Sequence, residues 1–422
     1  MELKFCKIGE IVDLQQGLCI NKKTEHLLAE NGIPLLRITD LINGTKEKFI
    51  NKELVPSKFI ANEKDMIYTR TGQVGLVFKN KYGIIHNNCF KIWSKTKEVK
   101  NSYIYWFLKQ NKIYEYVNSV AAGAAQPDLN HDAFKSIDFI YPDPDAQDKI
   151  VKILSNYDDL IENNNKRIKI LKEMAQKIYK EWFVDFKFPG HKTTTFKQTE
   201  LGEIPSDWLY KTIGSLLEHQ IGGGWGCEEK DEKYTESAYV IRGADIPNGR
   251  EGNIQNCPLR YHTSSNIKTR LLQINDIVFE VSGGSKGQPV GRSLLLNKNL
   301  FNQFNDNVIC ASFCKLLRPD VNQILPELVY LHLLNIYNNG EIEKYQTQST
   351  GIINFKFTFF LESEQVLVPN NNIQELLKKI IVPIFDEISL LGYKNQTLKQ
   401  TRDLLLPRLI SGEINVENLE FV

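Results

Sequence analysis

The stretch DAQDKIVKILSNYDDLIENNNKRIKILKEMAQKIYKEWF, residues 145–183, decides the fold of this 422-residue chain. Its apolar residues recur at alternating steps of four and three, the period of a helix that packs along one side against another helix. The seam comprises Ile150, Leu154, Tyr157, Ile161, Asn164, Ile168, Leu171, Ala175, Ile178 and Trp182. A helix of this length is far longer than is usual in globular domains. The sequence therefore predicts a spacer here and not an ordinary domain element.

A second seam of the same period lies near the other end of the sequence. It comprises Leu377, Ile381, Ile384, Ile388, Leu391, Asn395, Leu398, Arg402, Leu405 and Leu409. Pro383 predicts a start or kink near the N-terminal end of this helix, and Pro407 predicts its end. The two seams favour an antiparallel coiled coil of two long helices. The alternative is a pair of ordinary amphipathic helices, each packed on its own domain.

The rest of the chain contains an internal sequence repeat. Residues 36–44 (LRITDLING) correspond to 241–249 (IRGADIPNG), and 65–68 (DMIY) correspond to 276–279 (DIVF). Each half continues with a glycine loop (71–75; 282–287), a short helix (103–108; 327–334), a glycine turn (Gly123; Gly351) and a strand that ends at Pro142 or Pro369. This order, kept twice, predicts an α+β fold with two similar globular parts and a pseudo-two-fold internal repeat.

Composition and charge indicate which classes of protein are compatible with this sequence. The chain is 42% hydrophobic and 24% charged, and its length predicts two or more domains. It has neither a membrane-length apolar run nor a signal-peptide pattern, so we expect a cytoplasmic protein. The seven cysteines include no C-x-x-C pair, which argues against a disulfide framework or a zinc ribbon. The net charge of +1 hides an excess of five positive charges in residues 1–140, so the first half is the more suited to nucleic acid.

This order of globular and helical parts resembles the specificity subunits of type I restriction-modification systems over essentially the whole chain. The most specific matches are residues 170–183 (ILKEMAQKIYKEWF), 186–191 (FKFPGH), 202–208 (GEIPSDW) and 401–414 (TRDLLLPRLISGEI). One departure is that the first half starts abruptly at Phe5, without a counterpart of residues 202–208.

The resemblance implies a fold and a function. We expect target recognition domain 1 at residues 1–142, a first spacer helix at 143–188, a linker at 189–207, target recognition domain 2 at 208–370, a second spacer helix at 371–411 and a tail at 412–422. Each domain would read one part of a bipartite, asymmetric duplex DNA target. Two methyltransferase subunits and two restriction subunits would assemble on the chain and carry the S-adenosylmethionine, ATP and Mg. The alternatives are a DNA-recognition subunit of another restriction or phage-defence system, or a scaffold that binds only proteins.

No catalytic motif is present in the sequence. A methyltransferase needs an Asn-Pro-Pro-Phe/Tyr type loop for the flipped base, and the chain has no Asn-Pro dipeptide. It also lacks a G-x-x-x-x-G-K-[ST] phosphate loop, a G-x-G-x-x-G turn and an H-E-x-x-H zinc pair. We therefore expect no catalytic residue, metal or cofactor of its own in the chain. It would be the non-catalytic subunit of a type I site-specific deoxyribonuclease and adenine methyltransferase complex.

Glycine-rich polar loops are the candidates for DNA contact, because glycine permits close approach and Arg or Gln can pair with two base atoms at once. In the first half the candidates are Gln15, Lys22, Lys23, Arg70, Thr71, Gly72 and Gln73. In the second half they are Ser282, Gly283, Ser285, Lys286 and Gln288. For each loop the alternative is a plain hairpin turn. The run Gly222-Gly223-Gly224-Trp225-Gly226 precedes acidic residues that repel phosphate, so only its glycine end is expected near DNA.

Arg37 and Arg242 occupy matching positions in the two halves. Residues that specify a target should differ between halves, whereas matched residues should serve the scaffold. We therefore expect structural ion pairs of these arginines with Asp40 and Asp245.

Two further sets of residues belong to the long helices. Asn164 and Asn395 interrupt the apolar seams, and an antiparallel arrangement about Lys166 would let them pair and fix the helical register. Trp182, Phe183 and Phe186, with Phe188, form an aromatic cluster that suits the docking of a partner subunit. The alternative for this cluster is that it caps the coiled coil against the second domain.

Overall fold

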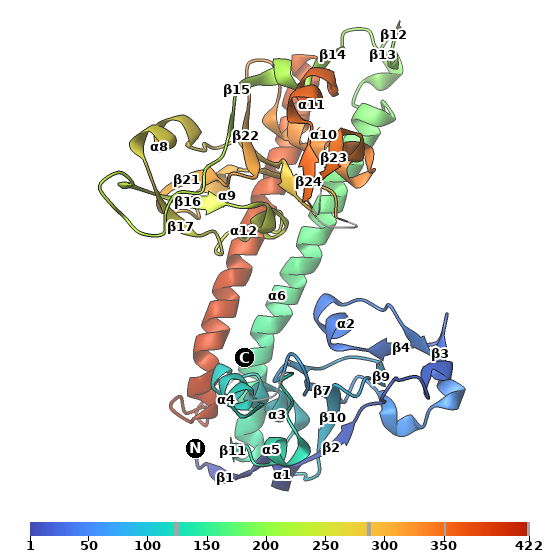
Figure 1. The fold of residues 1–422 in the computed structure, drawn as a ribbon, viewed down its shortest axis with the longest axis vertical. Helices are drawn as coiled ribbons and strands as arrows, with labels where there is room; N and C mark the ends of the chain where they lie inside the picture. The colour runs from blue at the N-terminus through green and yellow to red at the C-terminus, as the bar shows by residue number, and fades with distance from the viewer. Residues whose placement is uncertain (122–125, 285–287, 350–351, 420–422) are drawn as a thin grey trace. The chain divides into compact units, whose positions relative to one another are not determined.

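The computed structural model describes residues 1–121, 126–284, 288–349 and 352–419 (Figure 1). It divides the chain into two compact units. Unit 1 comprises Met1–Leu160 and Leu398–Val422, and unit 2 comprises Ile161–Thr397. The chain passes between the units inside two long helices, α6 (Pro144–Tyr179, 36 residues) and α12 (Asn371–Ile410, 40 residues). None of the helices in these described ranges is long and apolar enough to cross a membrane.

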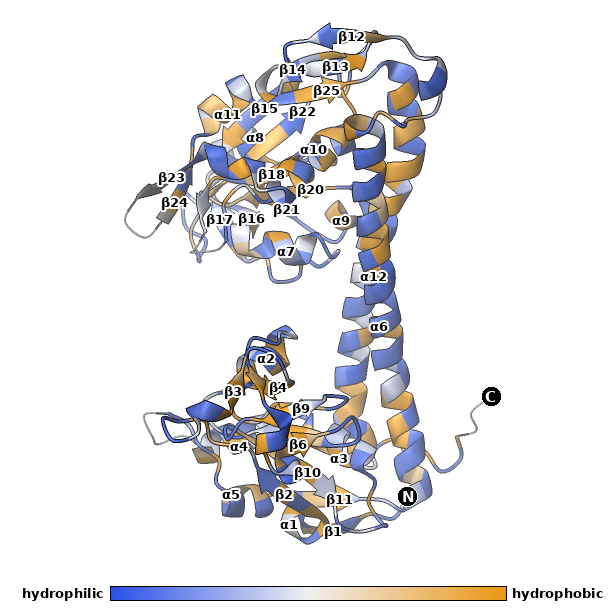
Figure 2. Cartoon of the chain, turned by 90° about the vertical axis from the view of Figure 1, so that its right-hand side faces the viewer, coloured by the Kyte–Doolittle hydropathy of each residue, from blue (hydrophilic) through white to orange (hydrophobic). Residues whose placement is uncertain are grey.

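The two long helices are antiparallel, as the sequence predicted. In unit 2, Asn164 and Arg167 of α6 contact Asn395 and Glu387 of α12, so residue numbers rise along one helix as they fall along the other. The seam residues Ile168, Ala175, Leu377, Ile381 and Leu391 are all buried. Apolar and polar residues are interleaved along both helices in Figure 2, as a seam on one side of each helix requires.

The first helix is shorter than its predicted range, residues 143–188, whereas the second agrees with its predicted range, residues 371–411, although its two prolines had suggested other ends. The first helix ends at Tyr179 and continues only as a π-helical turn, Lys180–Val184, instead of reaching residue 188. The second helix begins at Asn371, well before Pro383, and runs past Pro407 to Ile410. Tertiary packing offsets the loss of a backbone donor at each proline, because the neighbouring seam residues of α12 lie in the hydrophobic cores of the two units.

Unit 1 is built around a four-stranded antiparallel sheet. Its strand order is β2-β10-β7-β8, with β2 Val12–Gln16, β10 Cys89–Ser94, β7 Met66–Thr69 and β8 Val77–Phe78. A two-stranded ladder joins β1 (Lys4–Lys7) to β11 (Asp138–Tyr141). A mixed sheet has the order β3-β5-β4-β9-β6, with β3 Leu28–Ala29, β5 Phe49–Ile50, β4 Ile33–Leu36, β9 Gly83–Ile85 and β6 Ile60–Ala61.

Short helices cover these sheets, and aromatic side chains fill the core of unit 1. The helices are α1 (Ile8–Ile11), α2 (Ile38–Asn43), α3 (Asn101–Leu108), α4 (Asn111–Ala121) and α5 (His131–Lys135). Three 3-10 turns are Glu25–Leu27, Lys52–Leu54 and Ser57–Phe59. Trp106, Tyr103, Phe107 and Phe134 are completely or almost completely buried. The core also takes in Leu406, Leu409 and Ile410 from the end of α12, so unit 1 is assembled from both ends of the sequence.

Unit 2 repeats this plan. Its main sheet has the order β15-β22-β18-β20, with β15 Leu217–Gly222, β22 Cys314–Pro319, β18 Ile277–Glu280 and β20 Ser293–Leu295. A ladder joins β14 (Leu209–Thr212) to β25 (Gln365–Val368), and a mixed sheet has the order β17-β16-β21, with β17 Leu259–His262, β16 Glu236–Ile241 and β21 Asn307–Cys310. A further sheet has the order β19-β24-β23, with β19 Ser282–Gly283, β24 Ile352–Phe355 and β23 Gln346–Ser349.

The helices of unit 2 pack on these sheets. They are α7 (Ile246–Gly249), α8 (Ser264–Arg270), α9 (Lys298–Phe301), α10 (Pro326–Asn338) and α11 (Phe357–Ser363). Four 3-10 turns of this unit are His191–Thr193, Ile213–Leu216, Gly243–Asp245 and Glu341–Tyr345. The predicted short helices, at residues 103–108 and 327–334, correspond to α3 and α10.

The internal repeat predicted from the sequence is confirmed by the strand pairing. The four-stranded sheets have equivalent orders and antiparallel neighbours, and β1 and β11 pair as β14 and β25 do. Each mixed sheet contains a parallel strand pair, β4 with β9 in unit 1 and β16 with β21 in unit 2. The strands predicted to end at Pro142 and Pro369 are β11 and β25. The glycine turns predicted at Gly123 and Gly351 lie outside the described residues.

The predicted linker, residues 189–207, contains a β-hairpin. Strands β12 (Phe196–Thr199) and β13 (Gly202–Pro205) pair in antiparallel register. The ring of Phe196 lies edge-on to Phe186 at 5.8 Å, and Ile204 is buried in the core of unit 2. Because this segment contributes to a core, it belongs to the folded part of unit 2.

Candidate DNA interface

The first glycine loop leaves the edge of the main sheet of unit 1 at the end of β7. The backbone amide of Arg70 donates to the backbone carbonyl of Asn88 over 2.8 Å. The backbone amide of Gly72 donates to the backbone carbonyl of Pro127 over 2.9 Å. Gly72 and Gly75 have φ values of 84° and 94°, which favour glycine. Gly72 and Gln73 are exposed, so the tip of the loop is accessible.

Arg70, a candidate for base contact in this loop, already forms an ion pair within unit 1 through its guanidinium. Its Nη2 lies 2.7 and 2.5 Å from the two carboxylate oxygens of Asp128, and its guanidinium lies 5.4 Å from the ring centroid of Phe90. Only 14% of its side chain is exposed. A bidentate contact to guanine would require this pair to break. The structure therefore favours a role for Arg70 within the loop over the predicted contact with a base.

The second glycine loop leaves the equivalent sheet edge of unit 2, at the end of β18. Ser282 donates from Oγ to Oδ1 of Asn354 over 2.9 Å, and Gly283 and Gly284 have positive φ values of 126° and 64°. Ser285 and Lys286 lie outside the described residues. Gln288, at the far side of this gap, is exposed.

A buried ion pair lies at the base of this second loop. Arg292 donates from Nε and Nη2 to the carboxylate of Glu280 over 2.8 and 2.5 Å, and the two side chains are 11% and 3% exposed. The hydrogen bonds that Arg292 donates to Glu280 raise the pKa of the Arg292 guanidinium. The pair braces the loop from its two ends, because Glu280 precedes the loop and Arg292 follows it.

The remaining candidates of the first half lie elsewhere on unit 1. Gln15 is on β2, opposite Lys91 of β10, and its amide donates to the carbonyl of Gln16 over 2.8 Å. Lys22 and Lys23 are exposed in the following turn. The side chain of Asn21 shapes that turn by accepting from the amide of Lys23 over 2.9 Å. The lysines are therefore available to phosphate, whereas Gln15 is half-buried on the sheet.

The matched arginines form the expected structural ion pairs. Arg37 contacts the Asp40 carboxylate at 2.6 and 3.1 Å, and Arg242 contacts that of Asp245 at 2.9 and 2.8 Å. Both aspartates are buried. Burial alone would raise the pKa of Asp40, but hydrogen bonds from Arg37 and Thr45 hold it below its usual value. The prediction that these residues serve the scaffold is confirmed.

The aromatic cluster at the end of α6 is not presented to a partner. Trp182, Phe183 and Phe188 are buried in the core of unit 2, and Phe186 is half-buried. The rings of Phe183 and Phe188 lie 5.5 and 4.7 Å from Trp208. The prediction of partner docking is therefore wrong for the buried rings. The alternative is correct, since the cluster seals the end of the helix against the globular part of unit 2.

Asn164 and Asn395 meet across the helix pair, as predicted. Nδ2 of Asn164 donates to Oδ1 of Asn395 over 2.9 Å, and Nδ2 of Asn395 donates to Oδ1 of Asn165 over 2.8 Å. Asn164 is buried, at 8% exposed. The side-chain amide of Asn395 therefore accepts from Asn164 and donates to Asn165 across the helix pair.

One buried polar network in unit 2 has no signal in the sequence. Glu364 accepts from Tyr345 at 2.5 Å and lies 3.0 Å from both His332 Nε2 and Lys344 Nζ, while Nδ1 of His332 lies 3.0 Å from the hydroxyl of Tyr179. Burial alone would raise the pKa of Glu364, but these hydrogen bonds lower it to about 2. The network ties the end of α6 to α10 and α11. Its members come from four separate segments, so no local pattern marks them.

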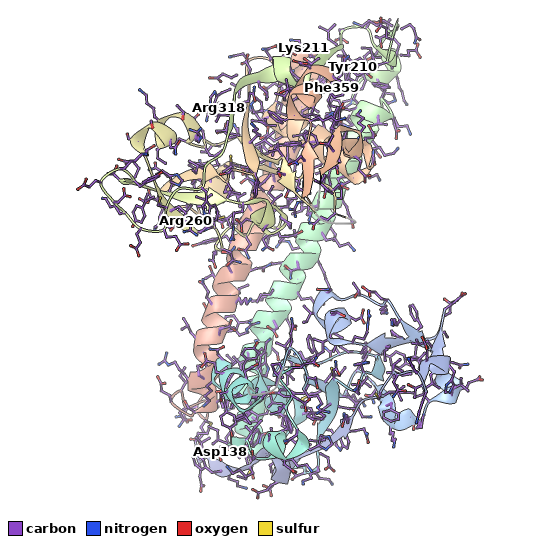
Figure 3. The ribbon with its side chains drawn as sticks, viewed as in Figure 1. Asp138, Tyr210, Lys211, Arg260, Arg318 and Phe359 are labelled. Atoms are coloured by element: carbon purple, nitrogen blue, oxygen red, sulfur yellow. The ribbon has the colours of Figure 1, made fainter. Side chains whose placement is uncertain are left out.

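A second feature missed by sequence reasoning lies beside the triple glycine. Arg260, labelled in Figure 3, places its guanidinium 4.7 Å from the ring centroid of Trp225 and pairs with Glu228 over 2.6 Å. Trp225 is 41% exposed. Glu228, in the acidic segment that was predicted to repel phosphate, thus neutralises the charge of Arg260 within unit 2. In the described residues no group of three or more His, Cys, Asp or Glu side chains could hold a metal.

Comparison with known proteins agrees with this architecture. The sequence model of the type I restriction modification DNA specificity domain matches residues 1–173. The chain is similar to the type I restriction enzyme MjaIX specificity subunit of Methanocaldococcus jannaschii, with 25% identity over 84% of this chain and 78% of the relative. It is also similar to the HindI specificity subunit of Haemophilus influenzae, with 22% identity over 97% of this chain and 95% of the relative.

A solved structure shares the fold. The crystal structure of a type I restriction-modification S subunit from M. genitalium superposes with a TM-score of 0.57 and 15% sequence identity, covering 97% of this chain and 96% of that one. The sequence matches, the repeated units and the shared fold lead to one conclusion. The chain is similar to type I restriction-modification specificity subunits over most of its length.

Proposed function

We propose that this chain is a type I restriction-modification specificity subunit and that it reads a bipartite and asymmetric sequence in double-stranded DNA, one part with each unit. The observation that carries the proposal is that units of the same topology present a glycine loop at the same sheet edge, with different chemistry around it. In unit 1 the loop is short and braced by Arg70. In unit 2 it is longer and braced by Glu280 and Arg292. A common scaffold with unlike reading surfaces suits two unlike half-targets.

Contacts to the DNA backbone and contacts to bases fall to different residues in this proposal. Exposed lysines such as Lys22 and Lys23 contact phosphates, which fixes the position of the protein on the duplex without reading sequence. The loop tips, at Gly72 and Gln73 in unit 1 and near Gln288 in unit 2, contact base edges. A glutamine amide pairs bidentately with adenine, and glycine permits the close approach that this contact needs.

Partner subunits dock on the long helices and not on the aromatic cluster. Ile170 and Met174 on α6 are 54% and 46% exposed, and Leu390 and Tyr393 on α12 are 36% and 48% exposed. Each pair is spaced three or four residues apart, so its members share one face of their helix. Exposed apolar side chains gathered in this way mark protein interaction sites. Two methyltransferase subunits and two restriction subunits are the partners that fit the family.

Catalysis belongs to those partners. The complex acts as a type I site-specific deoxyribonuclease and adenine methyltransferase in the cytoplasm, and S-adenosylmethionine, ATP and Mg bind to the methyltransferase and restriction subunits. This chain supplies DNA recognition and the docking surface for the partners. A preparation of the chain free of other subunits is expected to transfer no methyl group, hydrolyse no ATP and cleave no DNA, and any of these activities would contradict this part of the proposal.

Methylation mapping tests the central proposal. The chain is expressed with its cognate methyltransferase subunit in a host without other DNA methylation, and methylated adenines are located by genome-wide sequencing. The expected result is one motif made of two short defined sets of bases separated by a fixed gap. Methylation without a motif, or the same motif when this chain is omitted, would exclude sequence reading by the chain.

A docking test separates recognition from assembly. Ile170→Asp combined with Met174→Asp places charge on the exposed face of α6 and is expected to reduce co-purification of the methyltransferase subunit. The matched control is Lys169→Asp, since this neighbouring side chain is 78% exposed. Equal loss in both variants would show that charge alone, and not the apolar face, controls assembly.

A further inference from the structure

Hydrogen bonds give a residue-by-residue match between the two glycine loops. The amide of Leu129 donates to the carbonyl of Arg70 over 2.8 Å, and the amide of Phe355 donates to the carbonyl of Val281 over 2.9 Å. Arg70 therefore corresponds to Val281, and the following residues correspond in turn: Thr71 to Ser282 and Gly72 to Gly283 on the loop, and Asp128 to Asn354 on the neighbouring strand segment.

The match resumes beyond the tip of each loop. Val74 and Val290 are both completely buried, and Gly75 and Gly291 both have positive φ values, of 94° and 103°. The one residue Gln73 therefore stands where the second loop has residues 284–289. This difference in length hides the correspondence in the sequence.

The same side-chain hydrogen bond occurs at the matched position of each loop. Thr71 donates from Oγ1 to Oδ1 of Asp128 over 2.5 Å. Ser282 donates from Oγ to Oδ1 of Asn354 over 2.9 Å. We call this bond the hydroxyl clamp. In both units it joins the glycine loop to a strand segment that lies far away in the sequence.

The hydroxyl clamp is retained although its surroundings differ. In unit 1 the acceptor is a carboxylate that also pairs with Arg70. In unit 2 the acceptor is an amide, and the residue in the place of Arg70 is Val281. The shared elements are a hydroxyl on the loop and an Oδ1 acceptor on the segment bridged to it, an isolated bridge at Asp128 and strand β24 at Asn354. A charge pair is thus dispensable to the arrangement, whereas the hydroxyl is present in both units.

The position of the hydroxyl clamp gives it control over the loop tip. Thr71 and Ser282 stand directly before Gly72 and Gly283, whose φ values of 84° and 126° start the turn of the tip. Glycine offers little conformational restraint of its own. Fixing the residue before it therefore fixes the direction in which the tip leaves the sheet.

We propose that Thr71 and Ser282 are positioning residues for DNA reading, each holding its glycine loop in the reading position through Asp128 or Asn354. The inference rests on the proposed function, because it assumes that the loop tips contact bases. It adds that the two hydroxyls act separately. Loss of one relaxes recognition in the half of the target read by that unit and leaves the other half unchanged.

Paired variants that differ by one atom or one methyl group test the proposal. Thr71→Val keeps the shape of the side chain and removes the hydroxyl. Thr71→Ser keeps the hydroxyl and introduces the residue type found at the matched position of unit 2, Ser282. Ser282→Ala and Ser282→Thr form the corresponding pair in unit 2. Each full-length variant is expressed with the cognate methyltransferase subunit, and adenine methylation is mapped at sites that match the wild-type motif or differ from it by one base.

A single hydrogen bond contributes about 1 kcal/mol, so we expect about a fivefold to tenfold rise in methylation of mismatched sites in one half only for Thr71→Val. Ser282→Ala is expected to relax the other half, and Thr71→Ser and Ser282→Thr to retain the wild-type motif. Melting temperature and yield of the complex are recorded alongside, because a purely structural role would weaken methylation at all sites without a preference for one half.

The outcomes separate this inference from the proposed function. If the wild-type complex has no bipartite motif, the proposed function fails. If it has one, and Thr71→Val and Ser282→Ala leave the motif intact or relax both halves equally, the hydroxyl clamp is not a positioning device although DNA reading stands. Should Thr71→Val reduce the yield of folded protein, Ser282→Ala decides the question, since it removes only one oxygen atom from an exposed loop.

Discussion

Asn164 of α6 donates to Asn395 of α12 over 2.9 Å, and the nearby seam residues Ile168 and Leu391 are apolar and buried. The second bond, from Asn395 to Asn165, uses the remaining amide group of Asn395. A polar pair in such a seam lowers stability relative to leucine but penalises every other register, because a shifted helix would leave both amides unpaired. We propose that this pair sets the register of the helix pair in unit 2.

Replacing one asparagine is expected to cost more than replacing both. Asn395→Leu leaves the buried amide of Asn164 without its partner and should lower the free energy of unfolding by about 1–3 kcal/mol. Asn164→Leu with Asn395→Leu removes both amides and should restore or exceed wild-type stability. Urea unfolding followed by circular dichroism measures both variants, and a double variant less stable than the single one would contradict the pairing.

The Glu364 network predicts a pH dependence of stability. The pKa of Glu364 is about 2 in the folded protein against 4.5 for an ordinary glutamate. Its ionised form therefore stabilises unit 2 above about pH 4.5, and this contribution is lost as the pH falls toward 2. Glu364→Gln should be less stable than wild type at pH 7, and the difference should shrink between pH 4.5 and 2 by on the order of 3 kcal/mol.

Glu362→Gln is the matched control for this measurement, because Glu362 is exposed on α11, two residues before Glu364. It should follow the wild-type curve of unfolding free energy against pH. A constant difference between wild type and Glu364→Gln across this range would show that the carboxylate is not held by its neighbours as the geometry indicates.

Exchange of one recognition part should change one half of the target. Replacing residues 1–142 by the equivalent part of a relative is expected to alter only the bases read by unit 1, since each glycine loop has its own scaffold and braces. Methylation mapping of the chimaera checks this, with the reciprocal exchange of residues 208–370 as control. A change in both halves in either chimaera would refute independent reading.

The long helices should set the gap between the two halves of the target. The chain passes between the units only within α6 and α12. Inserting one heptad after Asn165 and another before Lys394 lengthens both helices at the same level and is expected to lengthen the unread gap while the bases read stay the same. An insertion in α6 alone offsets the register and should reduce methylation. Altered bases with an unchanged gap would contradict this role.

The sequence predicted the long helices and the repeat well because both depend on patterns that recur along the chain. Seam positions such as Ile168 and Leu391 are buried in the places that the heptad period requires. The same regularity predicted the meeting of Asn164 and Asn395, since an antiparallel pair has one centre. Pro383 and Pro407 do not mark the ends of the second helix, because they lie among residues whose packing holds the helix together.

Contacts between distant segments could not be predicted in the same way. The sequence marked Arg70 as a base reader, yet its guanidinium is taken by Asp128, which follows 58 residues later. The aromatic cluster from Trp182 to Phe188 has the composition of a docking surface, and its packing against Trp208 shows that it is part of a core. In each case the residue whose contact determines the role, Asp128 or Trp208, lies in another part of the chain. A local sequence pattern cannot predict such a contact.

The assembly of unit 1 from both ends of the sequence has a consequence for biosynthesis. Unit 2, residues 161–397, is contiguous and can complete its core as soon as it leaves the ribosome. Unit 1 must wait for Leu406, Leu409 and Ile410, although most of it is synthesised first. The earliest part of the chain is thus the last to close. Until then its apolar surface near Trp106 stays uncovered and open to chaperones.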